Sequence, residues 1–113
     1  MKLLLVDDEP LARQRLASLL RDLDGVEVVG EAGNGREAVE LAESLAVDVV
    51  LLDIAMPVMD GLEAARHLAQ LSPPPAVVFC TAFDQHALAA FEAAAVDYLV
   101  KPVRAERLAE AIE

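Results

Sequence analysis

Short apolar runs alternate with helical patterns along the whole sequence, and this alternation constrains the fold more than any other feature. Continuously apolar runs occupy residues 3–6, 49–52 and 77–80, and two weaker runs lie at 26–29 and 98–100. Strands that are apolar on both faces are typical of a parallel sheet with helices on either side. Between the runs, apolar residues recur every three or four positions, as in amphipathic helices. The alternation therefore predicts an α/β fold of roughly five strand–helix pairs.

The composition of the runs also predicts their order in the sheet. The run at 26–29 has Glu27 in its middle, and the run at 98–100 is short, so both are expected at sheet edges. This arrangement agrees with a flavodoxin-like (βα)5 three-layer sandwich, whose parallel five-stranded sheet has the order 2-1-3-4-5. In such sheets the functional site lies at the carboxyl ends of the strands, near the switch between the first and third strands.

Each expected helix has one apolar face and recognisable ends. Asn34 and Asp60 each precede a Glu by three residues, the spacing of a helix cap, and Pro10 suits a first helical turn. Pro73, Pro74 and Pro75 are expected to stop the third helix before the fourth strand. The predicted apolar faces comprise Ala12, Leu16, Leu19, Leu20 and Leu23; Ala38, Leu41, Ala42 and Leu45; Leu62, Ala65 and Ala69; Leu88, Phe91 and Ala95; and Leu108, Ala111 and Ile112.

Polar residues follow four of the apolar runs. Asp7 and Asp8 end the first run, Asp53 follows the run at 49–52, Thr81 follows the run at 77–80, and Lys101 follows the last. In a parallel sheet these side chains meet at one edge. Carboxylates packed this closely repel by about 4 kcal/mol per pair at a surface-like dielectric, so the cluster predicts a bound cation.

The predicted cation is Mg²⁺, which prefers carboxylate and carbonyl oxygens in octahedral geometry. Asp8 and Asp53 are expected as direct ligands, Asp7 as a ligand through water, and the carbonyl of Ala55 as a further ligand. Asp53 is then the nucleophile that accepts a phosphoryl group. Lys101 would neutralise one phosphoryl oxygen and the Thr81 hydroxyl would donate a hydrogen bond to another, since phosphoryl transfer depends mainly on positioning and charge.

Each of these residues also has an ordinary structural interpretation. An Asp pair after a strand is a common turn or helix cap, and a single Asp before a turn is equally common. A Thr at a strand end usually satisfies the backbone, and a Lys is usually a solvated cation. What favours a site is the convergence of all five residues on one side of one sheet.

Composition sets the wider limits. A chain of 113 residues fits one domain, and a formal net charge of −11 argues against a basic surface for nucleic acid. Cys80 is the only cysteine, which suits a reducing cytoplasm and a buried structural thiol. Charged residues interrupt every apolar run before it reaches membrane-spanning length, and no signal peptide is evident.

Several motifs together resemble a known family. VDDEP at 6–10, LLDIAMPVMDG at 51–61, TA at 81–82 and Lys101-Pro102 are similar to the receiver domain of bacterial two-component response regulators. The stretches DDEPLAR, PPAVVFCTA and AVDYLVKPVR are most similar to regulators of the LytTR type, including those of alginate biosynthesis. The resemblance covers the whole chain, 1–113.

The resemblance implies a role for each residue of the cluster. Asp7 and Asp8 match the family's acid pair, Asp53 its phosphoacceptor, and Lys101 its phosphate-binding lysine. Thr81 and Tyr98 match the switch hydroxyl and the switch aromatic residue. The resemblance also implies a cis peptide bond between Lys101 and Pro102.

For function, the resemblance implies a signalling domain that assists its own phosphorylation and dephosphorylation and is not an enzyme in its own right. The implied partner is a sensor histidine kinase. A homodimer is implied through the surface of the fourth helix, fifth strand and fifth helix, with Ala87, Ala90, Ala94 and Arg104 as members. DNA would be bound only by an output domain, which is expected outside this chain.

The sequence argues against three other interpretations. A haloacid-dehalogenase-type phosphatase needs a second Asp two residues after the nucleophile, where this chain has Ala55. A dinucleotide-binding module needs a glycine-rich turn after the first strand, where this chain has acids. A receiver that only mediates protein contacts would not need the intact acids, Thr81 and Lys101.

Overall fold

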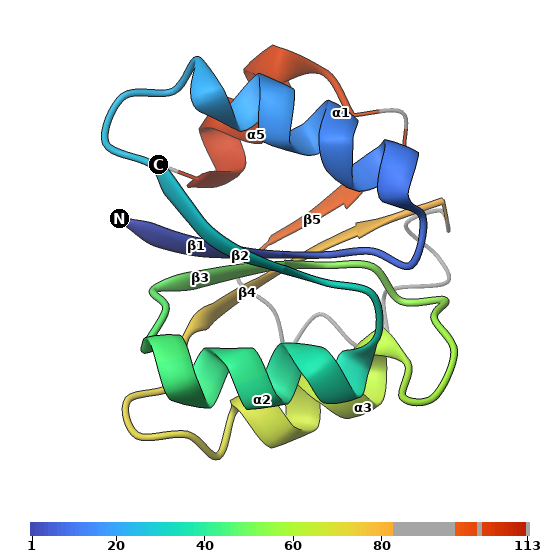
Figure 1. Ribbon diagram of the computed structural model, residues 1–113. Coiled ribbons are helices and arrows are strands. Elements are labelled where there is room, and N and C mark those ends of the chain that lie inside the picture. The colour runs from blue at the N-terminus through green and yellow to red at the C-terminus, as the bar shows by residue number, and fades with distance from the viewer. Residues whose placement is uncertain (83–96, 102, 113) are drawn as a thin grey trace.

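The computed structural model describes residues 1–82, 97–101 and 103–112. In this part of the chain, a parallel five-stranded sheet lies between α1 and α5 on one face and α2 and α3 on the other (Figure 1). The elements are β1 (Lys2–Val6), α1 (Pro10–Arg21), β2 (Glu27–Ala32), α2 (Gly35–Leu45), β3 (Val49–Leu52), α3 (Gly61–Leu68), β4 (Ala76–Thr81), β5 (Asp97–Val100) and α5 (Ala105–Ile112).

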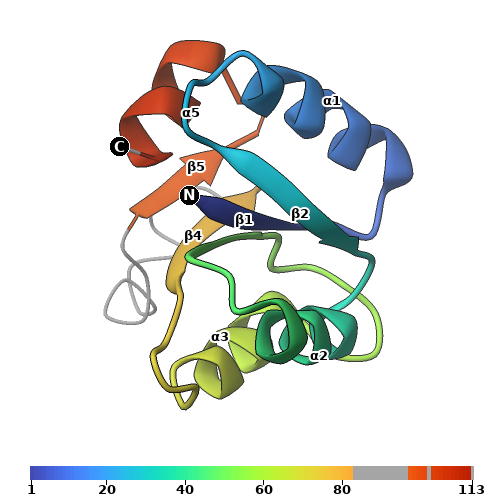
Figure 2. The ribbon, with the colours of Figure 1, turned by 60° about the vertical axis from the view of Figure 1, so that its left-hand side comes forward.

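The predicted strand order is confirmed. The sheet runs β2-β1-β3-β4-β5, and every neighbouring pair is parallel. The predicted bounds of the second strand are wrong: β2 spans Glu27–Ala32, so the exposed Glu27 is its first residue and not its middle. Its edge position is nevertheless correct, and most of its residues are partly exposed. The turned view in Figure 2 shows the twist of the sheet between its two helical layers. The predicted three-layer sandwich is therefore the observed architecture.

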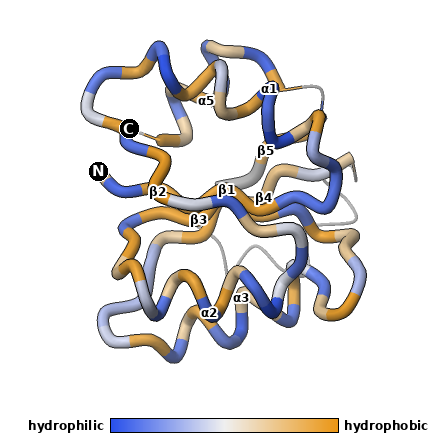
Figure 3. Tube along the Cα trace, viewed as in Figure 1, coloured by the Kyte–Doolittle hydropathy of each residue, from blue (hydrophilic) through white to orange (hydrophobic). Residues whose placement is uncertain are grey.

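Alternation along the central strands divides the core into two halves. Leu4 and Val6 of β1 contact the half under α2 and α3, whereas Leu3 and Leu5 contact the half under α1 and α5. Successive strand residues point to opposite faces, so a strand buried on both faces must be apolar throughout. Figure 3 shows this pattern, with hydrophobic residues along the strands and mixed hydropathy along the helices.

The helix predictions hold apart from two residues. Leu23 packs against the core, but from the turn after α1, which ends at Arg21. Leu16 and Leu20 bury one face of α1, but Ala69 is not part of the apolar face of α3. The helix ends at Leu68, and Ala69 is its exposed C-terminal cap. The residue that covers the core at this end is Leu68, which is fully buried. The predicted face at Leu88, Phe91 and Ala95 lies outside the described residues.

The predicted caps form. The side-chain oxygens of Asn34 and Asp60 accept hydrogen bonds at 2.9 Å from the backbone N–H groups of Glu37 and Glu63. Pro10 is the first residue of α1, where a missing N–H is harmless. These contacts fix where α2 and α3 begin, and both helices start beside the carboxyl edge of the sheet.

Within the described ranges, each helix is too short or too polar to cross a membrane.

Candidate functional site

The site begins with the register of β1 against β3. Val6 lies opposite Leu52, so the residues that follow, Asp7 and Asp53, leave the sheet side by side. The N–H of Asp53 donates to the carbonyl of Val6 at 3.1 Å, and the N–H of Asp7 donates to the carbonyl of Ala32 at 3.1 Å. Backbone hydrogen bonds therefore hold both acidic residues at the carboxyl edge of the sheet.

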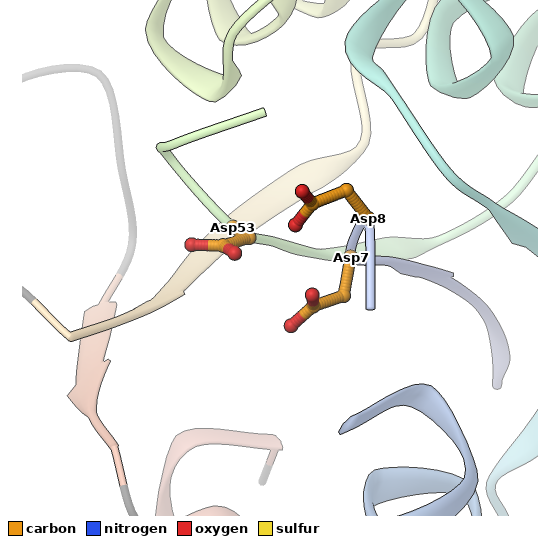
Figure 4. A group of neighbouring side chains, drawn as sticks. All are labelled: Asp7, Asp8 and Asp53. Carbon is orange, nitrogen blue, oxygen red and sulfur yellow. The ribbon is translucent and has the colours of Figure 1, made fainter. Parts of the chain in front are cut away.

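Three carboxyl groups meet at this edge, as predicted. One oxygen from each of Asp7, Asp8 and Asp53 lies within 4.8 Å of the other two. Figure 4 shows Asp7 and Asp8 leaving the chain on opposite sides, with Asp53 beside them at the end of β3. Asp7 and Asp53 are buried and Asp8 is exposed. Two acids of the cluster are therefore buried, and the third is open to solvent.

Lys101 lies against the same cluster. Its ammonium group donates to Asp7 Oδ2 at 2.7 Å and to Asp53 Oδ2 at 3.3 Å, and the lysine side chain is only 24% exposed. The N–H of Lys101 donates to the carbonyl of Thr81 at 2.8 Å, so the end of β4 holds the lysine backbone in place. In the described part of the chain, one ammonium group therefore contacts two buried carboxylates, and the cluster keeps a net negative charge.

The charges of this cluster change the protonation of its members. Burial raises the pKa of the Asp53 carboxyl, and the negative charge of Asp7 raises it further, while Lys101 opposes both effects. Burial alone would lower the pKa of Lys101, but its hydrogen bond to Asp7 and the charges of Asp53 and Asp7 outweigh burial and raise it. The lysine therefore stays charged at neutral pH. A further positive charge near Asp53 would stabilise its ionised form.

The remaining predicted site residues are placed as follows. Ala55 lies in the loop after β3 and is exposed, and Thr81 is buried as the last residue of β4. The backbone of Tyr98 lies in β5 opposite Phe79. The side chain of Tyr98 and the peptide bond to Pro102 fall outside the described part of the chain, as do the expected dimer residues Ala87, Ala90 and Ala94.

Sequence reasoning missed one contact of the acid pair. The guanidinium of Arg13 donates to the backbone carbonyl of Asp7 and, at 3.1 Å through Nε, to Glu31 of β2. These two contacts link α1 to the end of β1 and to β2. The sequence offers no signal that separates Arg13 from Arg15, because the choice depends on how α1 rotates over the sheet.

The donor set fits a hard divalent cation. Mg²⁺ prefers one or two carboxylates, together with water and substrate oxygens, over nitrogen or sulfur ligands. The residues that converge here offer carboxylate oxygens, and one of the three acids, Asp8, is open to water.

The nearby thiol of Cys80 is buried and unpaired with another cysteine, and burial raises its pKa to about 11. It is therefore a protonated structural thiol.

Comparison with known proteins identifies the family. The family model described as the response regulator receiver domain matches residues 3–113. The chain belongs to this family. Receiver domains are signalling domains that pair with histidine kinases, and they bind Mg²⁺ in an acidic pocket.

Relatives of this receiver domain include proteins named as regulators. It is 58% identical to the positive alginate biosynthesis regulatory protein of Pseudomonas aeruginosa, covering 100% of this chain and 46% of that protein. It is 39% identical to the transcriptional regulatory protein LytR of Staphylococcus aureus, covering 99% of this chain and 46% of that protein. The resemblance to LytTR-type regulators is thus confirmed, and the chain spans less than half the length of these relatives.

A solved structure supports the same conclusion. The response regulatory domain of mrkE from Klebsiella pneumoniae superposes with a TM-score of 0.87 at 36% identity, covering 99% of this chain and 92% of that one. The receiver fold is therefore the fold of this chain.

Proposed function

We propose that this receiver domain accepts a phosphoryl group on Asp53 from the phosphohistidine of a sensor histidine kinase. The observation that carries the proposal is the meeting of Asp7, Asp8 and Asp53 with the ammonium group of Lys101 at one edge of the sheet. A buried carboxylate beside a lysine and two further acids is suited to accept phosphate, provided that a cation balances the added charge.

Mg²⁺ is the cation that we propose for this site. Asp8 and Asp53 would bind it directly, Asp7 through a water molecule, and Ala55 through its carbonyl oxygen. When bound, the ion supplies positive charge that offsets the carboxylates and the incoming phosphoryl oxygens. The shared position of the three acids, within 4.8 Å of one another, supports this assignment.

The protein side chains then perform the transfer. A carboxylate oxygen of Asp53 bonds to phosphorus as the phosphorus–nitrogen bond to the donor imidazole breaks. Lys101, which already contacts the Asp53 carboxylate, neutralises a phosphoryl oxygen, and the hydroxyl of Thr81 donates to another. Attack by water on the phosphorus later releases inorganic phosphate and regenerates Asp53. The domain therefore assists both steps, but its product is a signalling state.

Phosphorylation would change a surface remote from the acids. Thr81 would move toward the phosphoryl group and Tyr98 would turn into the space behind it, which shifts the population of two conformations. The affected surface would comprise the predicted fourth helix, which lies outside the described residues, together with β5 and α5, and through it the domain would dimerise. Arg104, exposed just before α5, is a described residue on this surface.

The output would be control of transcription. Two relatives bear names of transcriptional or biosynthetic regulators and are more than twice as long as this chain. We propose that residues 1–113 form the receiver domain of such a regulator and that a separate DNA-binding domain acts on genes. The single buried cysteine and the kinase partner both fit the cytoplasm.

The test is phosphoryl uptake from acetyl phosphate or a phosphorylated kinase, followed by intact mass. The wild-type chain should gain one phosphoryl group in Mg²⁺ and none in EDTA. Asp53→Asn should gain none, whereas Asp24→Asn, which changes an exposed acid in the loop after α1, should behave as wild type. If the wild-type chain takes up no phosphate from any donor, the contact-only receiver becomes the better interpretation.

A further inference from the structure

The loop of residues 53–60, which joins β3 to α3, contacts the first residue of α2. The backbone N–H of Gly35 donates to the carbonyl of Met59 at 2.8 Å. Gly35 is buried, and the Met59 side chain packs against the core beneath α2 and α3. Figures 1 and 2 show the start of α2 beside this loop. A residue far from the acids in sequence thus holds the loop that contains Asp53 and Ala55.

Space around Gly35 is too small for any side chain. A Cβ atom at this position would lie 2.4 Å from the carbonyl oxygen of Met59 and 3.0 Å from that of Asp60. Ordinary contact begins at 3.4 Å, so the loop and the helix would have to separate by about 1 Å. Both obstructing atoms are backbone atoms, which a change of rotamer cannot move. Close approach, and not an unusual φ angle, requires glycine here.

The loop has few ways to absorb such a shift. At its other end, Gly61 donates from its N–H to the carbonyl of Ile54 at 2.8 Å. In between, Val58 adopts φ 69°, a left-handed conformation that is costly for a β-branched residue. Met59 itself donates to the carbonyl of Pro57 at 2.7 Å. A displacement at Met59 is therefore passed along a short, constrained loop toward Ala55 and Asp53.

From these contacts we propose that Gly35 is a positioning residue for the phosphoacceptor site. The absence of a side chain at Gly35 sets the distance between the loop and the start of α2. This distance in turn sets the position of the Ala55 carbonyl relative to the three acids. This role rests on the proposed function, because it matters only if the loop helps to bind Mg²⁺. It adds to the site a residue that contacts neither the cation nor the phosphate.

The test compares Gly35→Ala with Gly33→Ala. Gly33 lies two residues earlier, and a Cβ there would meet only side-chain atoms of Glu37 and Arg13, at 3.5 and 3.6 Å. Mg²⁺ affinity is measured by titration in ¹H–¹⁵N NMR. Gly35→Ala should weaken Mg²⁺ binding by roughly tenfold to a hundredfold, the usual effect of changing groups that orient metal ligands. Gly33→Ala should bind Mg²⁺ as the wild type does.

Thermal unfolding separates positioning from helix stability. Alanine in place of glycine ordinarily stabilises a helix, so a purely local effect would raise the melting temperature of Gly35→Ala and leave Mg²⁺ affinity unchanged, which would overturn the proposal. If Gly35→Ala does not fold, the role of Gly35 is tested instead in the ¹H–¹⁵N NMR spectrum of the wild-type protein. The Gly35 amide resonance should shift with those of Asp53 and Ala55 as Mg²⁺ is added, and a Gly35 resonance that stays fixed would overturn the role.

The two proposals fail differently. Wild-type protein that shows no Mg²⁺ binding would overturn both the proposed function and the role of Gly35. Wild-type protein that binds Mg²⁺ and accepts phosphate, alongside a Gly35→Ala variant that does both equally well, would overturn only the role of Gly35.

Discussion

Replacing Lys101 by methionine should destabilise the metal-free domain strongly. The ammonium group lies 2.7 Å from Asp7 Oδ2 and 3.3 Å from Asp53 Oδ2. At an effective dielectric constant of about 20, each contact contributes roughly 5 to 6 kcal/mol of attraction. Desolvation of the lysine offsets much of this attraction. Removing one partner of a buried ion pair leaves uncompensated charge, so we expect Lys101→Met to lose about 3 kcal/mol of unfolding free energy.

The assay is urea unfolding followed by circular dichroism at neutral pH in EDTA. Lys2→Met is the matched control, because Lys2 is the other lysine of the chain and is exposed. It should change stability by less than about 0.5 kcal/mol. Adding Asp7→Asn to Lys101→Met should restore part of the loss, since it removes one of the unpaired charges. If Lys101→Met and Lys2→Met unfold alike, the charge balance described for this site is wrong.

Three further predictions concern burial and close contacts. Because burial raises the pKa of Asp53 above its ordinary value of 3.8, its ionisation destabilises the fold as pH rises through that raised pKa. In EDTA, Asp53→Asn should therefore be more stable than wild type at neutral pH, and the difference should vanish below the ordinary pKa. Gly61→Ala places a Cβ atom 2.0 Å from the Asp53 carbonyl oxygen. The variant should lose about 3 kcal/mol of unfolding free energy in urea and take up no phosphoryl group. Unfolding and phosphoryl uptake equal to those of the wild type would disprove the close approach. The Cys80 thiol, with a pKa of about 11, should resist iodoacetamide at pH near 8 until the chain unfolds, which mass spectrometry of labelled protein would show.

The features that sequence reasoning predicted correctly are those set by periodicity and strand order. Continuously apolar runs define strands covered on both faces, and one charged strand, β2, marks an edge. Once β1 and β3 are neighbours in a parallel sheet, Asp7 and Asp53 must emerge together. Their meeting therefore follows from topology and does not require knowledge of any loop.

Other features depend on backbone geometry that the sequence does not encode locally. The contact of Arg13 with the Asp7 carbonyl depends on the rotation of α1 over the sheet. The contact of Gly35 with Met59 depends on how a loop and a helix far apart in sequence pack together. Ala69 continues the apolar spacing of α3, yet the helix ends one residue earlier. Spacing predicts which face is buried more reliably than it predicts where a helix stops.

The most direct test of the account is to locate the phosphoryl group chemically. Phosphorylated protein is treated with borohydride, which reduces an aspartyl phosphate to homoserine, and the peptides are then sequenced by mass spectrometry. The account predicts homoserine at position 53, in amounts that depend on Mg²⁺ during phosphorylation. Homoserine at position 7 or 8 and not at position 53, or phosphate without any reducible acyl phosphate, would contradict it.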